Sequence, residues 1–297
     1  YCLGTRTFWM CESLTSTSWL SEGLGELEGY DAFGEGCFHG AGITSLDYAA
    51  DSVTKVPAYC FAETKIKDGL GSIGNQTLTE LGEYCFYGCD ALESIEELNN
   101  SSVTRLPDYC FAGCTELTSI DGIQNIYSKI EIIDGKEVDN RSGAHIFEGC
   151  SKLEDISDLS SASQITDLPD YAFSGCTSLS QLSGLYNISS LGEYCFSGCS
   201  SLTDISGLHK EQIENDEPPT QITKIPKYCF SGCIGLKTLI GCWAIEIIEE
   251  GAFSNCTGLL SITGIGENIV IIGQNAFQNC TGLLYVSTIA STVPNIQ

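Results

Sequence analysis

Cysteine is the residue type in this sequence with the widest possible chemistry, because it forms disulfides, binds metals and acts as a nucleophile. The chain has 17 cysteines in 297 residues. Most of them occupy two slots, four residues apart, in a recurring motif of the form Tyr-Cys/Ala-Phe-x-Gly-Cys. The earlier slot holds Ala172, Ala252 and Ala276 in three copies whose later slot still holds Cys. We therefore interpret the repeat cysteines as small, buried thiols, against the alternative of a disulfide or metal ladder.

The three histidines are the other candidates for catalysis or metal binding. His145 takes a slot that Tyr fills in most copies of the motif, His39 lies at a variable position and His209 begins a loop. None recurs with a nucleophile and an orienting carboxylate, and the sequence has no Cys-x-x-Cys pair. Glycines at the spacing of a dinucleotide fingerprint occur in 69–74, but in a segment that connects parts of a repeat. We expect no catalytic residue, no metal site and no cofactor, and hence no enzyme.

Two kinds of covalent modification have candidate positions. Cys2 and Cys11 lie outside the recurring motif and are the best candidates for a disulfide, with two unpaired thiols as the alternative. Sequons for N-glycosylation lie in the connecting segments, where a glycan would be tolerated, although several arise by chance in a sequence rich in Ser, Thr and Asn. The candidate acceptors are Asn75, Asn99, Asn100, Asn140 and Asn187.

The elements that position these residues are repeats, anchored on one phenylalanine each. The base spacing of the anchor is 23 to 26 residues, and two repeats are longer by about ten. Each unit contains two short extended pieces, Leu-x-x-Ile-x-x-Leu and apolar-Thr-x-apolar, and a tight helical turn whose Gly or Asn suits a left-handed backbone. One unit cannot bury its apolar residues alone, so we predict an α/β leucine-rich-repeat solenoid of about ten stacked repeats, with parallel short strands and short helical turns. The anchors are Phe38, Phe61, Phe86, Phe111, Phe147, Phe173, Phe196, Phe230, Phe253 and Phe277.

The motif Tyr-Cys/Ala-Phe-x-Gly-Cys-x-x-Leu-x-x-Ile closely resembles the BspA-type leucine-rich repeat, over residues 33 to 290. The resemblance implies a right-handed solenoid on a surface protein of a bacterium or a protozoan parasite, with a role in adhesion to host proteins or to other cells. The chain departs from the family pattern in two ways. Cys often stands where the family more usually has Ala, and two repeats carry insertions.

The domain organisation follows from where the repeat pattern begins and breaks. Residues 1–32 do not match it and are expected to be an N-terminal cap or a degenerate repeat, while 33–297 form the solenoid, which we expect to continue beyond 297. The insertions lie at 124–144 and 209–221. The first has Asp-Gly between β-prone runs and predicts a hairpin, and the second is acidic and predicts a loop. Each is either a binding element or a tolerated surface loop.

The residues on either side of the central Ile of the first extended piece are expected to face outward, because side chains alternate along a strand. They form hydroxyl-rich, acidic rows that suit a basic protein patch, or that simply keep the sheet solvated. The recurring tyrosines offer a second surface, either for stacking sugars or for packing against each other. The residues of the predicted ligand-binding face are Ser94, Glu96, Ser119, Asp121, Asp155, Ser157, Gln181, Asp204 and Ser206.

The charge restricts the partners. The chain has 39 acidic and 13 basic residues, a formal net charge of −26, so we expect no nucleic-acid partner. No apolar run approaches the ~18 residues of a membrane span, so we expect no direct membrane insertion. We predict an extracellular or cell-surface protein that binds a protein partner, with a basic protein or a protein on a host or cell surface as the candidates. The alternative is a structural subunit or spacer of an extracellular filament or surface layer, with self-association.

Overall fold

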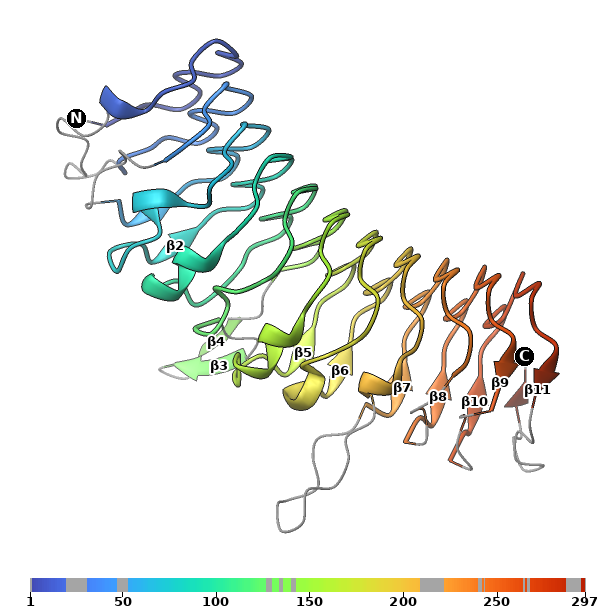
Figure 1. Ribbon diagram of the computed structural model, residues 1–297. Coiled ribbons are helices and arrows are strands. Elements are labelled where there is room, and N and C mark those ends of the chain that lie inside the picture. Colours follow the sequence, from blue (N-terminus) through green and yellow to red (C-terminus); the bar gives the residue numbers. More distant parts are fainter. Residues whose placement is uncertain are drawn as a thin grey trace. The chain divides into compact units, whose positions relative to one another are not determined.

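The computed structural model describes residues 2–19, 31–46, 53–126, 130–133, 136–139, 143–208, 222–239, 242, 244–263, 265, 268–286 and 295–296. The chain divides into two compact units, Tyr1–Ser151 and Lys152–Gln297, and each is described by itself. Figure 1 shows that both units consist of successive coils of chain, each of which ends in a tight turn. Within the described residues, no helix is long and apolar enough to cross a membrane.

The apolar-Thr-x-apolar piece forms a two-residue strand that pairs in parallel with the same piece of the next repeat. Its apolar side chains point into the core because alternate residues of a strand face opposite sides. Val56, for example, is fully buried, whereas Lys55 beside it is half-exposed. The strands are β1 (Lys55–Val56) with β2 (Glu80–Leu81) in the first unit; in the second they are β5 (Asp167–Leu168) with β6 (Ser190–Leu191), and a sheet of β7 (Lys224–Ile225), β8 (Ile247–Ile248), β10 (Ile271–Ile272) and β12 (Asn295–Ile296).

Among the described residues, the Leu-x-x-Ile-x-x-Leu piece is a regular strand only in the last repeats, as β9 (Ser261–Ile262) and β11 (Tyr285–Val286), which are parallel. In five other repeats its second half is a 3-10 helix, so the expected strand through this half was wrong there. For η3, η4 and η6 the physical reason is a local cap, which is described below for the polar residue before the central Ile. These helices are η2 (Gly71–Ile73), η3 (Glu96–Asn100), η4 (Ser157–Ser160), η5 (Leu185–Asn187) and η6 (Ser206–Leu208).

The turn of each repeat contains two left-handed residues, of which the sequence predicted one. The Gly slot has positive φ as expected, from 65° at Gly88 to 75° at Gly198, and 60° at Asn255. The tyrosine four residues earlier is also left-handed, with φ of 57° at Tyr84 and 57° at Tyr194. Two such residues cannot belong to an α-helix, so the helical turn expected from the sequence was wrong. No α-helix occurs anywhere in the part of the chain that the structure describes.

Hydrogen bonds between successive turns compensate for this unfavourable backbone. The N–H groups of Tyr84, Phe86 and Gly88 donate to carbonyl oxygens of the next turn, at N···O distances of 3.0, 3.0 and 2.8 Å. The acceptors are the carbonyl groups of Asp108, Cys110 and Ala112. The same three-bond pattern recurs from turn to turn within each unit, so every turn is held by its neighbours.

The anchor phenylalanines form the centre of the core. In the first unit, the rings of Phe61 and Phe86 stack with centroids 5.6 Å apart and planes 12° apart. In the second unit, Phe196 is fully buried and stacks on Phe173 and Phe230, each at 5.6 Å. Burial of one such ring stabilises the fold by roughly 2–3 kcal/mol. The predicted core position of the anchor is therefore correct in both units.

The two insertions differ in what the structure shows of them. The first contains an antiparallel hairpin, β3 (Ile130–Ile133) with β4 (Lys136–Asp139), at the place where the sequence predicted one. The second, 209–221, lies outside the described residues. At the N-terminus, Leu3 pairs in parallel with Phe33, and Arg6 has a φ of 55°, which is the turn geometry of the repeats.

Candidate binding surface

The predicted acidic rows are built on a local cap, which recurs at the polar residue before the central Ile. The Oγ of Ser94 accepts a hydrogen bond from the N–H of Glu96, at 3.1 Å. Asp155 Oδ1 accepts from the N–H of Ser157 at 2.9 Å, and Asp204 Oδ1 accepts one in the same way. Such side-chain to backbone bonds favour a turn over a continued strand, so they explain why 3-10 helices begin here.

Asp155 in the second unit accepts several hydrogen bonds besides the cap. Its Oδ2 also accepts a hydrogen bond from Ser157 Oγ at 2.6 Å, and its Oδ1 accepts one from Ser183 Oγ of the next repeat at 2.9 Å. Burial acts to raise the pKa of Asp155, but the hydrogen bonds from Ser157 and Ser183 outweigh it, so the pKa lies below its ordinary value. The carboxylate is therefore ionised and fixed in orientation.

Asp121 plays a similar part in the first unit. Its Oδ1 accepts hydrogen bonds from Gln124 Nε2 at 2.9 Å and from Asn99 Nδ2 at 3.0 Å. These two bonds, that from Gln124 first, lower the pKa of Asp121. Because Asn99 belongs to the preceding repeat, the charge of Asp121 also links two repeats.

The other members of the predicted face reach solvent to different extents. Exposed side chains are suited to contact a partner, whereas half-buried ones mainly support them. The described residues include no group of three or more potential ligands arranged for a metal ion. Exposed are Glu96, Asp155, Gln181 and Ser206, and half-buried are Ser94, Ser119, Asp121, Ser157 and Asp204.

The tyrosine slot forms a stacked column, which favours packing over sugar binding. Ring centroids of Tyr59 and Tyr84 are 4.7 Å apart, and those of Tyr84 and Tyr109 are 4.5 Å apart, with nearly parallel planes. His145 continues this column on Tyr109 at 4.1 Å, as expected of a residue in a tyrosine slot. A sugar would need a free ring face, and the neighbouring rings cover both faces of Tyr84. Burial, and next the charge of Tyr109, raise the pKa of Tyr84 to about 12.

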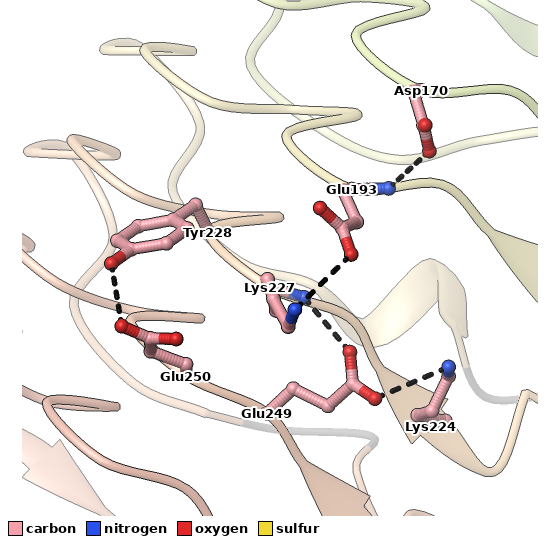
Figure 2. A network of polar contacts seen from close by, with 7 residues as sticks. All are labelled: Asp170, Glu193, Lys224, Lys227, Tyr228, Glu249 and Glu250. Atoms are coloured by element: carbon pink, nitrogen blue, oxygen red, sulfur yellow. Dashed lines mark hydrogen bonds and ion pairs between the residues drawn. The ribbon is translucent and has the colours of Figure 1, made fainter.

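A network of polar residues joins repeats of the second unit (Figure 2). Lys227 Nζ lies 3.7 Å from Glu193 Oε1, and Lys224 Nζ lies 3.3 Å from Glu249 Oε1. Tyr228 Oη donates to Glu250 Oε1 at 3.0 Å, and this hydrogen bond is the main cause of the raised pKa of Tyr228. The charged groups contact each other and are half-exposed, so the network joins repeats on the surface.

The repeat cysteines are buried except Cys280, which is half-buried, and cysteine in the later slot has a role that the sequence did not reveal. Its thiol donates a hydrogen bond to the carbonyl of the preceding anchor phenylalanine, as from Cys199 to Phe173 at 3.3 Å and from Cys256 to Phe230 at 3.1 Å. Alanine cannot supply this hydrogen bond, so the first repeat, whose later slot holds Ala41, lacks it, whereas eight later repeats have Cys in this slot. Burial raises the pKa of Cys199 to about 12, so the thiolate is scarce near neutral pH. The described cysteines form no disulfide ladder.

The predicted modification sites remain predictions, and the structure gives their surroundings. Cys2 is half-buried and Cys11 is exposed. Asn75 Nδ2 donates to the carbonyl of Ser72 at 2.7 Å, so a glycan there would compete with a local contact. Asn99 binds Asp121 as described, Asn187 Nδ2 donates to the carbonyl of Ser160, and Asn100 is exposed. Asn140 lies outside the described residues.

Solved structures of leucine-rich repeat proteins have a similar fold. A leucine-rich repeat protein from Bacteroides ovatus matches with a TM-score of 0.59 and 21% identity, over 85% of this chain and 62% of that one. The pneumococcal vaccine antigen PcpA matches with a TM-score of 0.53 and 16% identity, over 89% of this chain and 67% of that one. The chain thus spans less than two thirds of the Bacteroides protein. No curated protein matches.

The sequence itself matches a family model, described as the BspA type leucine rich repeat region, over residues 31–136, 132–215 and 208–297. That model describes six copies, so the comparison supports a repeat count of about six and not the ten expected from the phenylalanine spacing. Stacked turns, buried phenylalanines and these overlapping matches agree, and the chain belongs to the BspA-type leucine-rich-repeat family.

Proposed function

We propose that this chain is a non-catalytic protein-binding module, exposed on a cell surface or secreted, whose repeats continue as one solenoid. The observation that carries the proposal is the recurring acidic and hydroxyl row, with carboxylates held in place by hydrogen bonds, at Asp121 in the first unit and at Asp155 and Asp204 in the second. Such a row presents oriented charge at little entropic cost on binding, because the side chains are already ordered. PcpA, a relative in fold, is a pneumococcal vaccine antigen, which accords with surface exposure.

The partner that fits this surface is a protein with a basic patch. Opposite charges across an interface mainly raise the association rate and the specificity. The row offers little apolar area, so the affinity from the row alone is modest and falls as salt screens the charges over ~8 Å. The hairpin of β3 and β4 is a second element of the first unit that could contribute contacts.

The test removes four carboxylates of the row, of which Glu96 and Asp155 are exposed, and substitutes serine, which can also cap, for the capping aspartates. The variant combines Glu96→Ser, Asp121→Ser, Asp155→Ser and Asp204→Ser; Ser94 shows that serine can cap at this position. A matched control changes four exposed glutamates elsewhere to Ser: Glu12, Glu35, Glu83 and Glu246. Both variants have a net charge of −22, from −26 plus four.

Binding is measured by surface plasmon resonance with an immobilised lysine-rich peptide at two salt concentrations. We expect the row variant to bind about tenfold more weakly than the control, through a lower association rate, since each exposed charge pair is worth about 0.2–1 kcal/mol. Equal loss in both variants would show that general surface charge, and not the row, attracts the peptide. The hairpin would then be the next element to test.

A further inference from the structure

Two buried thiols in the middle of the first unit lie against each other. The Sγ atoms of Cys85 and Cys110 are 3.3 Å apart, and either thiol could donate a hydrogen bond to the other. Both residues are fully buried and occupy the earlier slot of successive repeats, 25 residues apart. We name them the thiol pair. The later-slot thiols beside them are directed at anchor carbonyls instead, Cys89 at 3.1 Å and Cys114 at 3.3 Å.

The backbone holds the thiol pair at a separation that a disulfide can span. On one side of it the rings of Tyr84 and Tyr109 stack at 4.5 Å, and on the other side the two anchor phenylalanines stack at 5.5 Å. The backbones between these stacked rings are therefore about 5 Å apart, as neighbouring strands are. Disulfides join residues whose Cα atoms are roughly 4.4–6.8 Å apart, with an S–S bond of about 2.05 Å. The two Sγ atoms need to approach by little more than about 1 Å.

The sequence leaves Cys110 one partner in this slot. On the side of the following repeat its neighbour is the buried Ile146, because the N–H of Phe111 donates to the carbonyl of Ile146 at 3.0 Å. On the side of the preceding repeat its neighbour is Cys85, since the N–H of Phe86 donates to the carbonyl of Cys110 at 3.0 Å. A disulfide within this slot can therefore join Cys110 only to Cys85.

Burial decides when such a bond forms. In the folded chain burial, and next the hydrogen bond with Cys85, raise the pKa of Cys110 well above its ordinary value. Its thiolate, which is the form that attacks a disulfide, is therefore scarce. Both residues are also closed to solvent. The bond would thus form while the two repeats dock, before further repeats cover the sulfur atoms, and reductants would reach it poorly afterwards.

We infer that Cys85 and Cys110 are a disulfide site, which joins two successive repeats covalently when the chain folds in an oxidising environment. That environment rests on the extracellular placement proposed above, and the oxidant is a small disulfide of the glutathione type. One protein thiolate attacks the oxidant, forms a mixed disulfide and releases one small thiol. The second protein thiolate then attacks the protein sulfur of the mixed disulfide and releases the other small thiol. Two S–H bonds break and one S–S bond forms, and the two small thiols carry away the two electrons and the two protons.

The bond affects two repeats and leaves the other cysteines as they are. Of the 17 cysteines it uses two, so 15 stay outside it. It closes a loop between positions 25 residues apart and so restricts the unfolded chain. The urea midpoint of the linked chain should therefore fall when the chain is reduced.

The experiment refolds the reduced 297-residue chain in a glutathione redox buffer and, in parallel, in excess dithiothreitol. Free thiols are blocked with N-ethylmaleimide, and the chain is digested with trypsin without reduction and analysed by mass spectrometry. Cleavage after Arg105 separates the thiol pair into the peptides 68–105 and 106–129. We expect these peptides to be joined in more than half of the chains from glutathione and to be separate in all chains from dithiothreitol.

Single-residue variants identify the linked cysteines, because each peptide also holds a later-slot cysteine. Cys85→Ala and Cys110→Ala should each abolish the link, and alanine fits this slot, as the fully buried Ala252 shows. Cys89→Ala is the matched control and should keep the link. Circular dichroism checks that the variants fold.

Separate peptides after refolding in glutathione would overturn the inference, and so would a link that persists in Cys85→Ala. A urea midpoint that does not fall on reduction of the linked chain would overturn the stabilising effect. The experiment needs no binding partner, so its failure would leave the proposed binding function as it stands.

Discussion

Substitutions at the left-handed glycine of the turn can separate two effects, the cost of a positive φ and the steric overlap of an added Cβ atom. Gly198 has a φ of 75°, and a Cβ built on it would lie 3.7 Å from its nearest neighbour, the Cα of Gly175. There is room for a methyl group, so Gly198→Ala costs only the left-handed backbone. That cost is about 1–2 kcal/mol for an ordinary L-residue. The reduced freedom of the unfolded chain returns about 0.4–1 kcal/mol, which leaves a net loss of about 1 kcal/mol.

Two further variants should lose less and more free energy of unfolding than Gly198→Ala. Gly198→Asn should be nearly neutral, because asparagine tolerates the left-handed region and Asn255 already occupies the same slot with a φ of 60°. Gly207→Ala should cost more, about 3 kcal/mol, because its Cβ would overlap the carbonyl oxygen of Leu182 and the backbone must shift. No positive φ contributes at Gly207.

The measurement is urea unfolding followed by circular dichroism, with the three variants compared by their midpoints at equal slope. The expected order of stability is Gly198→Asn, then Gly198→Ala, then Gly207→Ala. Equal losses for Ala and Asn at position 198 would refute the reasoning, since these residues differ mainly in their tolerance of the left-handed backbone. A loss at Gly198→Ala as large as that at Gly207→Ala would show that space, and not strain, is limiting there.

Three other outcomes follow from the structure. Thiol counting in denaturant without reductant should find more than half of the cysteines free, and alkylation of the native protein should modify the exposed Cys11 before the buried Cys199; only one or two free thiols would reveal a disulfide ladder. Phe196→Ala should lower the free energy of unfolding by about 3–5 kcal/mol and Tyr186→Ala by less than ~0.5 kcal/mol, which thermal or urea unfolding can check. Because the pKa of Asp121 is lowered in the folded state, its carboxylate stabilises the fold at pH values above the ordinary pKa of 3.8, and this contribution is lost as the pH falls through the lowered pKa. The difference in free energy of unfolding between the unchanged chain and Asp121→Asn should therefore shrink in acid. A difference that does not depend on pH would show that the charge of Asp121 is not its cause.

The parts of the fold that the sequence predicts are those in which one residue type serves one physical purpose. A phenylalanine that recurs once in every repeat is best explained by burial, and Phe196 is fully buried. Gly and Asn share few properties besides tolerance of positive φ, so their exchange between Gly198 and Asn255 predicts the left-handed slot. The β3–β4 hairpin follows in the same way from a turn dipeptide between β-prone runs.

The second left-handed slot was missed because tyrosine dominates it. A bulky residue is unfavourable at positive φ, and stacking with the next repeat outweighs this cost only once the repeats have assembled. The signal was present in the substitutions: Gly251 and Asn275 occupy the tyrosine slot in the last repeats, with φ of 62° and 58°. Because glycine and asparagine share this slot with tyrosine, the slot itself requires a left-handed backbone.

For the acidic row, the sequence predicted which positions face outward but did not reveal that some of these side chains also cap a 3-10 helix. Strand alternation placed Asp155 and Asp204 outward, and they are exposed or half-buried. Their hydrogen bonds to backbone N–H groups end the strand, however, so part of their role is local. A period-two pattern cannot distinguish a solvated carboxylate from a capping one, because both are polar and both lie beside a buried isoleucine.

The backbone bonds between repeats run in two opposite directions. In the turns the N–H group points to the following turn, as from Phe230 to Ala252 and from Phe253 to Ala276. On the strand side it points to the preceding repeat, as from Gly273 to Ile248 and from Glu246 to Thr223. The aligned peptide dipoles of the turns are therefore opposed by those of the strand side, whereas in an α-helix all peptide dipoles add.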